Sequence, residues 1–210
     1  MKLLTFNSYK RYINAQRKTL RFRGRGPYFN EVQIEKAARW LRNELGTDPV
    51  NGICHGARNG LECDEFKKHY PLADIFGTDL FPYSGKSAIH REKASVIVHD
   101  FSIQKPEWVD HFDFVFCNSM DHARDPAATI RVWLEQLSDR GRLLVKWVPN
   151  PYDKVKGGDC YSASLWEYVQ LGNLAGVVVD LLYTKIKKEN KNFLRRKSLE
   201  SVILGIKKKT

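Results

Sequence analysis

The spacing of apolar residues along the chain predicts one amphipathic helix near the start, followed by a series of short strands. In the first long segment, apolar residues recur at intervals of three and four, at Ile34, Ala37, Ala38, Leu41 and Leu45. This spacing predicts a helix. Asn30 and Gln33 have the spacing of a capping box, and Gly46 is typical of the residue just after a helix. We therefore expect a helix between Asn30 and Gly46.

Short apolar runs then alternate with helical segments. The runs lie at residues 49–55, 73–78, 94–99, 112–117 and 142–148. One helical segment spans residues 59–70 and ends at Pro71, and another begins at Asp125 and Pro126 and closes at Gly141. Strands that alternate with helices predict a mostly parallel sheet with helices on both faces.

The last part of the chain has a different pattern. After a helical segment at 164–171, two strand-like runs at 176–184 and 201–206 are joined by a basic connection without a helix. Two such runs predict an antiparallel hairpin at the edge of the sheet. The whole pattern predicts an α/β protein with a Rossmann-like, doubly wound sheet of seven strands, mostly parallel, with an antiparallel C-terminal hairpin.

Composition and charge narrow the class of protein. Hydrophobic residues make up 42% of the 210 residues, which excludes a disordered chain. The net charge of +11 is concentrated at the two ends: residues 1–25 hold eight Lys or Arg and no acid, and residues 184–210 hold ten basic residues and two acids. These ends either meet an anionic partner, as one shared patch or separately, or are solvated. We expect a basic N-terminal extension over 1–29 and one domain over 30–210.

Membrane and metal sites are not predicted. Apolar runs stay well short of the roughly 20 residues that a membrane helix needs, and residues 1–12 lack the apolar stretch of a secretory signal. The four cysteines include no CxxC pair, so we expect reduced thiols, a cytoplasmic location and no metal.

Candidate binding residues follow the strands. In an open parallel sheet, ligands bind at the carboxyl ends of the strands. The first such loop, Cys54-His-Gly-Ala-Arg-Asn-Gly60, has glycines at 56 and 60 and leads into a helix, whose N-terminus favours an anionic group. An ordinary tight turn is the alternative for this loop taken alone.

Two acids stand at the next strand ends. Asp79, 19 residues after Gly60, has the place and spacing of an acid that accepts hydrogen bonds from a ribose diol. Asp100 ends the third run and could accept from an exocyclic amine such as that of adenine, with Phe101 packing on a flat ring. Each acid alone could equally be a helix cap or a surface charge.

These residues resemble the motifs of class I S-adenosylmethionine-dependent methyltransferases over residues 30–206. The loop is similar to a variant of the first motif, CHGARNG, in which Cys54 replaces an acid and Arg58 replaces the middle glycine. The stretch after the fourth run is similar to a second motif of the family, at Phe112, Asp113, Asn118, His122, Asp125 and Pro126. The G-x-G-x-x-G pattern of nicotinamide-binding proteins is absent.

The resemblance implies S-adenosylmethionine as the cofactor. The implied binding set is Cys54, His55, Gly56, Ala57, Gly60, Asp79, Leu80, Asp100, Phe101 and Asn118. Within this set Gly56 and Gly60 would contact the methionine part, Asp79 the ribose, and Asp100 with Phe101 the adenine. Because Cys54 replaces an acid, the partner of the methionine ammonium is left open. His55 also suits a structural role within the loop.

Catalysis requires an acceptor aligned with an electrophilic methyl group. A nearby base assists, and histidine has a suitable pKa near neutrality. His122, just after the fourth run, is the first candidate, with Asp121 and Asn118 as lesser ones. The alternative is that His122 orders its loop or packs against the cofactor.

The resemblance implies O-methylation of a saccharide or another small acceptor, neutral or anionic. An RNA methyltransferase is the second choice, favoured by a pI near 9.5 but lacking an Asn-Pro-Pro-Tyr signature, since residues 118–121 read Asn-Ser-Met-Asp. A non-catalytic binding or scaffold protein with the same fold is the third. The basic stretch 16–28 could act as a lid, hold an anionic acceptor or follow a nucleic-acid backbone.

Overall fold

The computed structural model describes residues 1–20, 29–81, 96–147, 155, 158–187 and 198–209. Its central sheet has the order β4-β3-β2-β5-β6-β9-β8. The strands are β2 (Asn51–His55), β3 (Asp74–Asp79), β4 (Val96–Val98), β5 (Phe112–Cys117), β6 (Leu137–Trp147), β8 (Val177–Lys187) and β9 (Ser198–Lys207). The first five are parallel, and β9 pairs antiparallel with both β6 and β8. The predicted seven-stranded, mostly parallel sheet is confirmed.

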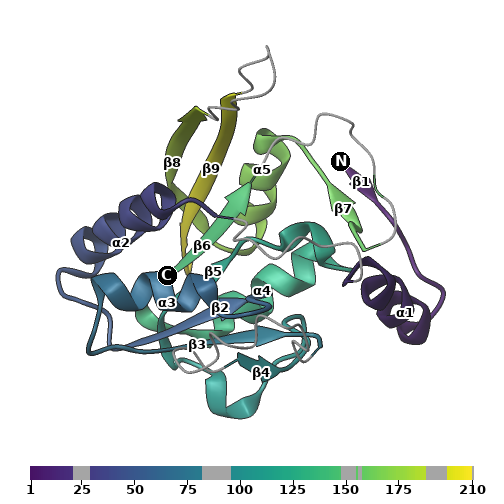
Figure 1. Ribbon diagram of the computed structural model, residues 1–210, viewed down its shortest axis with the longest axis horizontal. Helices are drawn as coiled ribbons and strands as arrows, with labels where there is room; N and C mark the ends of the chain where they lie inside the picture. Colours follow the sequence, from purple (N-terminus) through teal and green to yellow (C-terminus); the bar gives the residue numbers. More distant parts are fainter. Residues whose placement is uncertain (21–28, 82–95, 148–154, 156–157, 188–197, 210) are drawn as a thin grey trace.

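Helices cover both faces of this sheet (Figure 1). On one face lie α2 (Glu31–Leu45) and α3 (Leu61–His69), and on the other lie α4 (Pro126–Gln136) and α5 (Leu165–Ala175). The predicted capping box of α2 is present, with the Asn30 side chain accepting from Val32 N at 2.8 Å and the Gln33 side chain accepting from Asn30 N at 2.9 Å. Gly46 ends α2 in the left-handed conformation, φ 70°.

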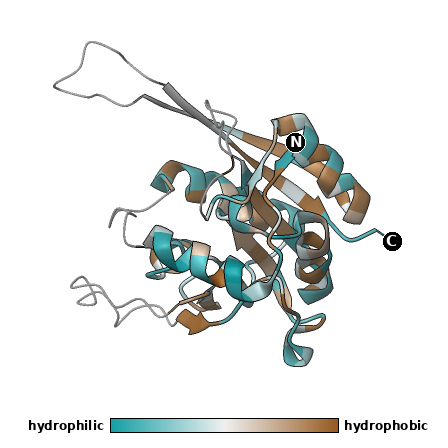
Figure 2. Cartoon of the chain, turned by 90° about the vertical axis from the view of Figure 1, so that its right-hand side faces the viewer, coloured by the Kyte–Doolittle hydropathy of each residue, from teal (hydrophilic) through white to brown (hydrophobic). Residues whose placement is uncertain are grey.

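The sheet separates two apolar cores, which follow from side-chain alternation along the strands. In β5, Phe114 and Phe116 pack with α2 and α3, whereas Val115 and Cys117 pack with α4 and α5. All six β5 residues are buried, as the continuous apolar run of a central parallel strand requires. Figure 2 shows the hydrophobic residues gathered in the sheet and on the inner sides of the helices.

Two boundaries differ from the prediction. Helix α4 begins at the predicted Asp125 cap, whose side chain accepts from Ala128 N at 3.0 Å, but it ends at Gln136. Gly141, expected to close this helix, lies inside β6. A Cβ at Gly141 would stand 2.6 Å from the carbonyl oxygen of Phe112, so glycine permits the close approach of β6 to β5 beside an irregularity in their pairing.

The C-terminal hairpin is present but longer than predicted. β8 reaches Lys187 and β9 starts at Ser198, so both strands enter the connection expected to be a loop. Residues 188–197 lie outside the described part. β9 is inserted between β6 and β8, which makes β8 the edge strand.

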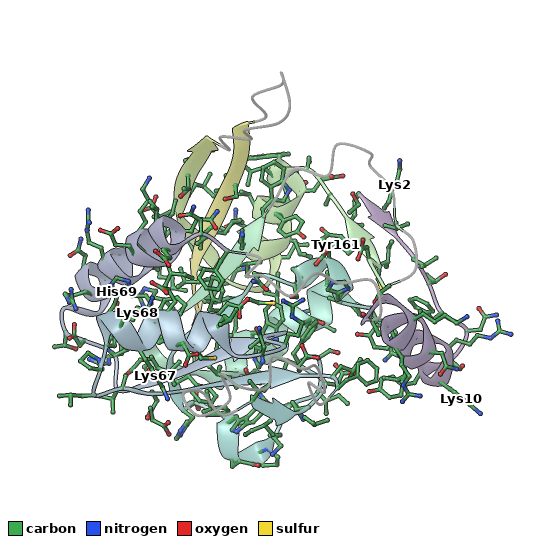
Figure 3. The ribbon with its side chains drawn as sticks, viewed as in Figure 1. Lys2, Lys10, Lys67, Lys68, His69 and Tyr161 are labelled. Atoms are coloured by element: carbon green, nitrogen blue, oxygen red, sulfur yellow. The ribbon has the colours of Figure 1, made fainter. Side chains whose placement is uncertain are left out.

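The first 20 residues pack against the domain. β1 (Lys2–Leu3) pairs antiparallel with β7 (Tyr161–Ser162), and α1 (Tyr9–Leu20) follows. Tyr12 of α1 is only 2% exposed. Figure 3 shows Lys2 and Lys10 pointing outward from this segment, and Tyr161 lying on the inner side of β7. These residues are therefore ordered parts of the fold, and their charges face solvent.

The described basic segments at the two ends of the chain lie at opposite ends of the parallel strands. Helix α1 reaches the carboxyl ends of the parallel strands, where Tyr9 contacts Asp100. The C-terminal Lys208 pairs with Asp110, just before β5 begins. Lys208 and α1 therefore do not form the single patch that the charge distribution had allowed. None of the described helices is both long and apolar enough to cross a membrane.

Candidate functional site

A pocket opens at the carboxyl ends of the parallel strands. About 380 Å³ of space there is not filled by protein atoms, part of it open to solvent. Its lining residues are Tyr12, Gln16, Gly56, Asp79, Leu80, Phe81, Phe101, Ser119 and His122. The position is the point where the strand order reverses, because β2 pairs with β3 on one side and β5 on the other. Ligands of open α/β sheets bind at such switch points.

Three alternate residues of the glycine loop have positive φ angles. Gly56 and Gly60 have φ values of 68° and 77°, and Arg58 between them has φ 48°. A Cβ at Gly56 would lie 2.7 Å from Cβ of Ser119 across the pocket wall, so only glycine fits there. Arg58 holds its left-handed conformation with a backbone amide that donates to Asp79 Oδ2 at 2.9 Å. This bond ties the loop to the end of β3.

Two acids stand at neighbouring strand ends, as predicted. Asp79 lines the pocket, and its Oδ1 accepts from Phe81 N at 3.2 Å. Asp100 accepts from Ser102 N at 2.9 Å through Oδ1 and from the hydroxyl of Tyr9 at 2.9 Å through Oδ2. Both acids are more than nine-tenths buried. Burial and the Asp100 carboxylate raise the pKa of Tyr9 to about 12, so this hydroxyl remains a donor at neutral pH.

Phe101 presents an apolar ring to the pocket. The ring packs edge to face on Trp133 at 5.4 Å, and Trp133 Nε1 donates to the Phe101 carbonyl at 2.9 Å. Its position is therefore fixed by the core beneath it. A fixed aromatic surface of this kind suits a flat ring system.

Three predicted residues of the loop turn away from the pocket. Cys54 and Ala57 are buried in the core under α2 and α3. Burial raises the pKa of the Cys54 thiol, and so does a hydrogen bond between this thiol and Cys63. All four cysteines are free and buried. The side chains of Cys54, His55 and Ala57 are not among the lining residues.

His55 is a structural residue on the opposite face. Its Nδ1 bonds Thr78 Oγ1 and its Nε2 bonds Gln136 Oε1, both at 2.8 Å, and its ring stacks on Trp133 at 5.5 Å. Burial lowers its pKa to about 4. The side chain of His55 thus belongs to the core, and a contact of His55 with the cofactor would have to come from its backbone.

The end of β5 supplies the other wall. Ser119 lines the pocket, and its hydroxyl donates to Asn118 Oδ1 at 2.9 Å. Asn118 does not line the pocket itself. Its Nδ2 donates to Glu62 Oε1 of α3 at 2.7 Å. Ser119 and Glu62 were not predicted as site residues, although both lie close to motif residues in the sequence.

His122 lies in the short 3₁₀ helix η3 (Met120–His122). His122 Nδ1 is 2.6 Å from the carbonyl oxygen of Gly158. The hydroxyl of Tyr12 donates to the backbone carbonyl of His122 at 3.2 Å. Since a carbonyl only accepts, Nδ1 carries the proton and Nε2 is the basic nitrogen of the neutral ring. The ring is 13% exposed and lines the pocket.

Two aspartates flank this histidine. Asp121 Oδ1 is 3.7 Å from His122 Nε2, and Asp159 Oδ1 is 3.8 Å from Nδ1. The three side chains could hold a metal ion, because one ligand atom from each lies within 4.8 Å of the others. Both aspartates are about half exposed, and exposed acids often lie together without an ion.

Helix α1 forms part of the site, and its residues 16–20 belong to the stretch predicted as a possible lid, whereas Tyr12 was not predicted. Tyr12 and Gln16 line the pocket, and the Gln16 amide donates to the Gly158 carbonyl at 2.7 Å. The predicted lid segment 16–28 is described only to residue 20; residues 21–28 lie outside the described part. The structure therefore brings Gly56, Asp79, Leu80, Phe101 and His122 of the predicted set together with α1.

Comparisons with known proteins place this geometry in a known fold. No protein-family model matches the sequence, and no curated protein matches it. The chain is similar to the structure of Burkholderia thailandensis 1,6-didemethyltoxoflavin-N1-methyltransferase, crystallised with 1,6-didemethyltoxoflavin and S-adenosylhomocysteine. That match has a TM-score of 0.69 and 16% identity, and it covers 97% of this chain and 92% of the other.

Two further solved structures give the same result. The plantazolicin methyltransferase BpumL, in complex with a triazolic desmethylPZN analog and S-adenosylhomocysteine, matches with a TM-score of 0.63, 17% identity, and coverage of 95% and 96%. The sugar N-methyltransferase KedS8 from Streptoalloteichus matches with a TM-score of 0.57, 17% identity, and coverage of 91% and 93%. The chain thus has the Rossmann-like fold of class I S-adenosylmethionine-dependent methyltransferases.

Proposed function

We propose that this protein is an S-adenosylmethionine-dependent methyltransferase. The observation that carries the proposal is the pocket itself, which gathers Gly56, Asp79 and Phe101 from three successive strand ends. Neighbours with this fold were crystallised with S-adenosylhomocysteine, the product of such a cofactor. The combination of fold, switch-point pocket and acids at two strand ends supports this cofactor more than any other.

The residues present fit this cofactor. The absent side chain at Gly56 lets Ser119 approach the glycine loop closely, and both residues line the pocket. Asp79 is oriented by two backbone amides and is suited to accept from ribose hydroxyls. Asp100 already accepts from Tyr9 and Ser102; a carboxylate has about four acceptor positions, so one more donor, such as the adenine amine, can be accommodated. Phe101 supplies the flat apolar surface.

The acceptor reacts beside His122. When bound, the cofactor supplies a methyl group made electrophilic by its sulfonium. His122 Nε2 would take the proton of an acceptor hydroxyl, so that the hydroxyl oxygen could accept the methyl group that the cofactor would supply. The Gly158 carbonyl keeps His122 in the tautomer that this step needs, and Asp121 stabilises the imidazolium that forms.

The acceptor is a saccharide or another small hydroxyl compound. The similar structures include complexes with 1,6-didemethyltoxoflavin and with a triazolic desmethylPZN analog, and a sugar N-methyltransferase, which supports an acceptor of modest size. The half-exposed Asp121 and Asp159 beside His122 favour a polar, hydroxylated acceptor, since carboxylates accept hydrogen bonds from hydroxyls.

A methyl-transfer assay tests this proposal. Purified protein is incubated with methyl-labelled S-adenosylmethionine and separate panels of saccharides, phenols, carboxylic acids and RNA. We expect label in a hydroxyl acceptor, and His122→Gln to lower kcat about 100-fold while changing cofactor affinity less than threefold. His111→Gln, an exposed histidine just before β5, is the control. Transfer to RNA alone, or unchanged kcat in His122→Gln, would contradict the assignment.

A further inference from the structure

Glu62 is a buried carboxylate that the site described above leaves unexplained. It lies in the first turn of α3, directly after the glycine loop, and is 5% exposed. Asn118 Nδ2 donates to its Oε1 at 2.7 Å, but Oε2 is buried and has no hydrogen-bond partner in the described part of the chain. Buried acceptors without partners are rare and costly, so such an atom calls for a physical reason.

The charge of Glu62 is poorly compensated. Arg58 and Lys146 lie near enough to lower its pKa through space, yet burial outweighs them and holds the pKa at about 7. Burial also lowers the pKa of Lys146 to about 8. An added positive charge near this carboxylate would therefore be attracted strongly, because the surroundings screen it little.

Glu62 stands directly behind one wall of the pocket. It bonds Asn118, Asn118 bonds Ser119, and the Ser119 hydroxyl is 3.5 Å from the carbonyl oxygen of Gly56. Ser119 and Gly56 line the pocket. This wall follows β2 and β5, whereas Asp79 and Asp100 follow β3 and β4. A ligand whose ribose and adenine meet Asp79 and Asp100 would turn its other end toward Glu62.

That other end of the proposed cofactor is cationic. It carries an ammonium group, a carboxylate and, next to the ribose, the sulfonium, so its positive charges outnumber its negative charge. The motif position that holds an acid in the family is Cys54 here, whose pKa burial raises, so a neutral thiol stands there at physiological pH. The Asp79 carboxylate accepts from Arg58 N and lines the pocket, and the Asp100 carboxylate accepts from the Tyr9 hydroxyl.

We propose that Glu62 supplies the negative charge that recognises the cationic methionine end of the cofactor, in place of the acid missing at Cys54. Asn118 orients the carboxylate by donating to Oε1. The inference rests on the proposed cofactor and assigns a residue to the group that the sequence motif left without a partner.

The test compares three ligands by calorimetry. S-adenosylmethionine carries an ammonium, a carboxylate and the sulfonium, S-adenosylhomocysteine keeps the ammonium and the carboxylate but lacks the sulfonium, and 5′-methylthioadenosine keeps adenine and ribose without the amino-acid end. We expect Glu62→Gln to weaken S-adenosylmethionine binding at least tenfold, S-adenosylhomocysteine binding by a smaller factor, and 5′-methylthioadenosine binding less than twofold. Glu62→Asp, which keeps the charge, is expected to lose less than Glu62→Gln.

Glu65→Gln is the matched control. Glu65 lies one turn from Glu62 in α3, is also buried, and pairs with Lys68; its variant should bind all three ligands as the wild type does. Unchanged S-adenosylmethionine affinity in Glu62→Gln overturns the proposal, and so does an equal loss for all three ligands, which would indicate a structural role. Wild-type protein that binds none of the three overturns the proposed function as well, and is distinguishable from both results.

Discussion

The glycine loop has two sides that differ in what they do. Gly56 faces the pocket with Asp79 and Ser119 around it, whereas Cys54 and His55, immediately before it, point into the two cores on opposite faces of the sheet. Adjacent residues of one strand end therefore serve packing and binding separately. The comparison teaches that a residue at the carboxyl end of a strand reaches the ligand only if its side chain points there.

This division predicts two separable kinds of variant. A substitution on the core side should change the free energy of unfolding and leave ligand affinity unchanged once the protein is folded. A substitution on the pocket side should do the reverse. A variant that changed both by similar amounts would break the distinction.

His55→Ala should have the largest effect and should act on stability. It removes the two buried hydrogen bonds that join His55 to Thr78 Oγ1 and Gln136 Oε1, and it opens a cavity against Trp133. We expect a loss of about 3 kcal/mol in the free energy of unfolding, measured by urea denaturation at pH 7. Cofactor affinity of the folded variant, measured at low temperature, should stay within threefold of the wild type.

The pH dependence of stability separates His55 from Glu62. The pKa of His55 is lowered to about 4, so its stabilisation is present above pH 6.5 and is lost as the pH falls toward 4. The pKa of Glu62 is raised to about 7, so its stabilisation is present below pH 4.5 and is lost as the pH rises through 7. The two contributions oppose each other between about pH 4.5 and 6.5.

When one of the two side chains is removed, the pH dependence of stability that the other causes should become visible. Relative to the wild type, Glu62→Gln should gain stability as the pH rises from 5 to 7, and His55→Ala should lose it, each by at most about 3 kcal/mol. Denaturation curves at several pH values measure both differences. Parallel curves for wild type and variants would show that neither group titrates in this range.

Asp79→Asn should have a smaller effect, directed at binding. The substitution keeps one oxygen for the backbone amides of Arg58 and Phe81 but removes the charge that a ribose diol would meet. We expect cofactor affinity to fall about 10- to 100-fold, or about 2 kcal/mol. Asp74→Asn, at the exposed start of the same strand, is the control and should bind as the wild type does.

Local signals in the sequence predicted much of the fold. The caps of α2 at Asn30 and Gly46 and the β5 strand at 112–117 depend on neighbouring residues alone, and both are confirmed. The end of α4 was wrong because Leu137 continues the apolar spacing of the helix although it begins β6. The spacing of apolar residues therefore could not show whether Leu137 ends the helix or begins the strand.

Contacts between distant residues formed the part of the site that sequence could not predict. Tyr12 and Gln16 reach the pocket because α1 follows β1, whose Lys2 pairs with Ser162. The direction of His55 was also hidden, since residues 52–55 of β2 are all buried and show no alternation of apolar and polar positions. Glu62 adjoins the motif, but only its burial and its contact with Asn118 distinguish it from a surface acid.

Isothermal titration of the wild-type protein with S-adenosylmethionine, and separately with S-adenosylhomocysteine, tests the central claim most directly. The account predicts saturable binding of both ligands at one site per chain, because the pocket at the ends of β2, β3 and β5 gathers Gly56, Asp79 and Ser119 around one ligand. If neither ligand bound, the proposed cofactor would be wrong, and the protein would use a methyltransferase fold for another purpose.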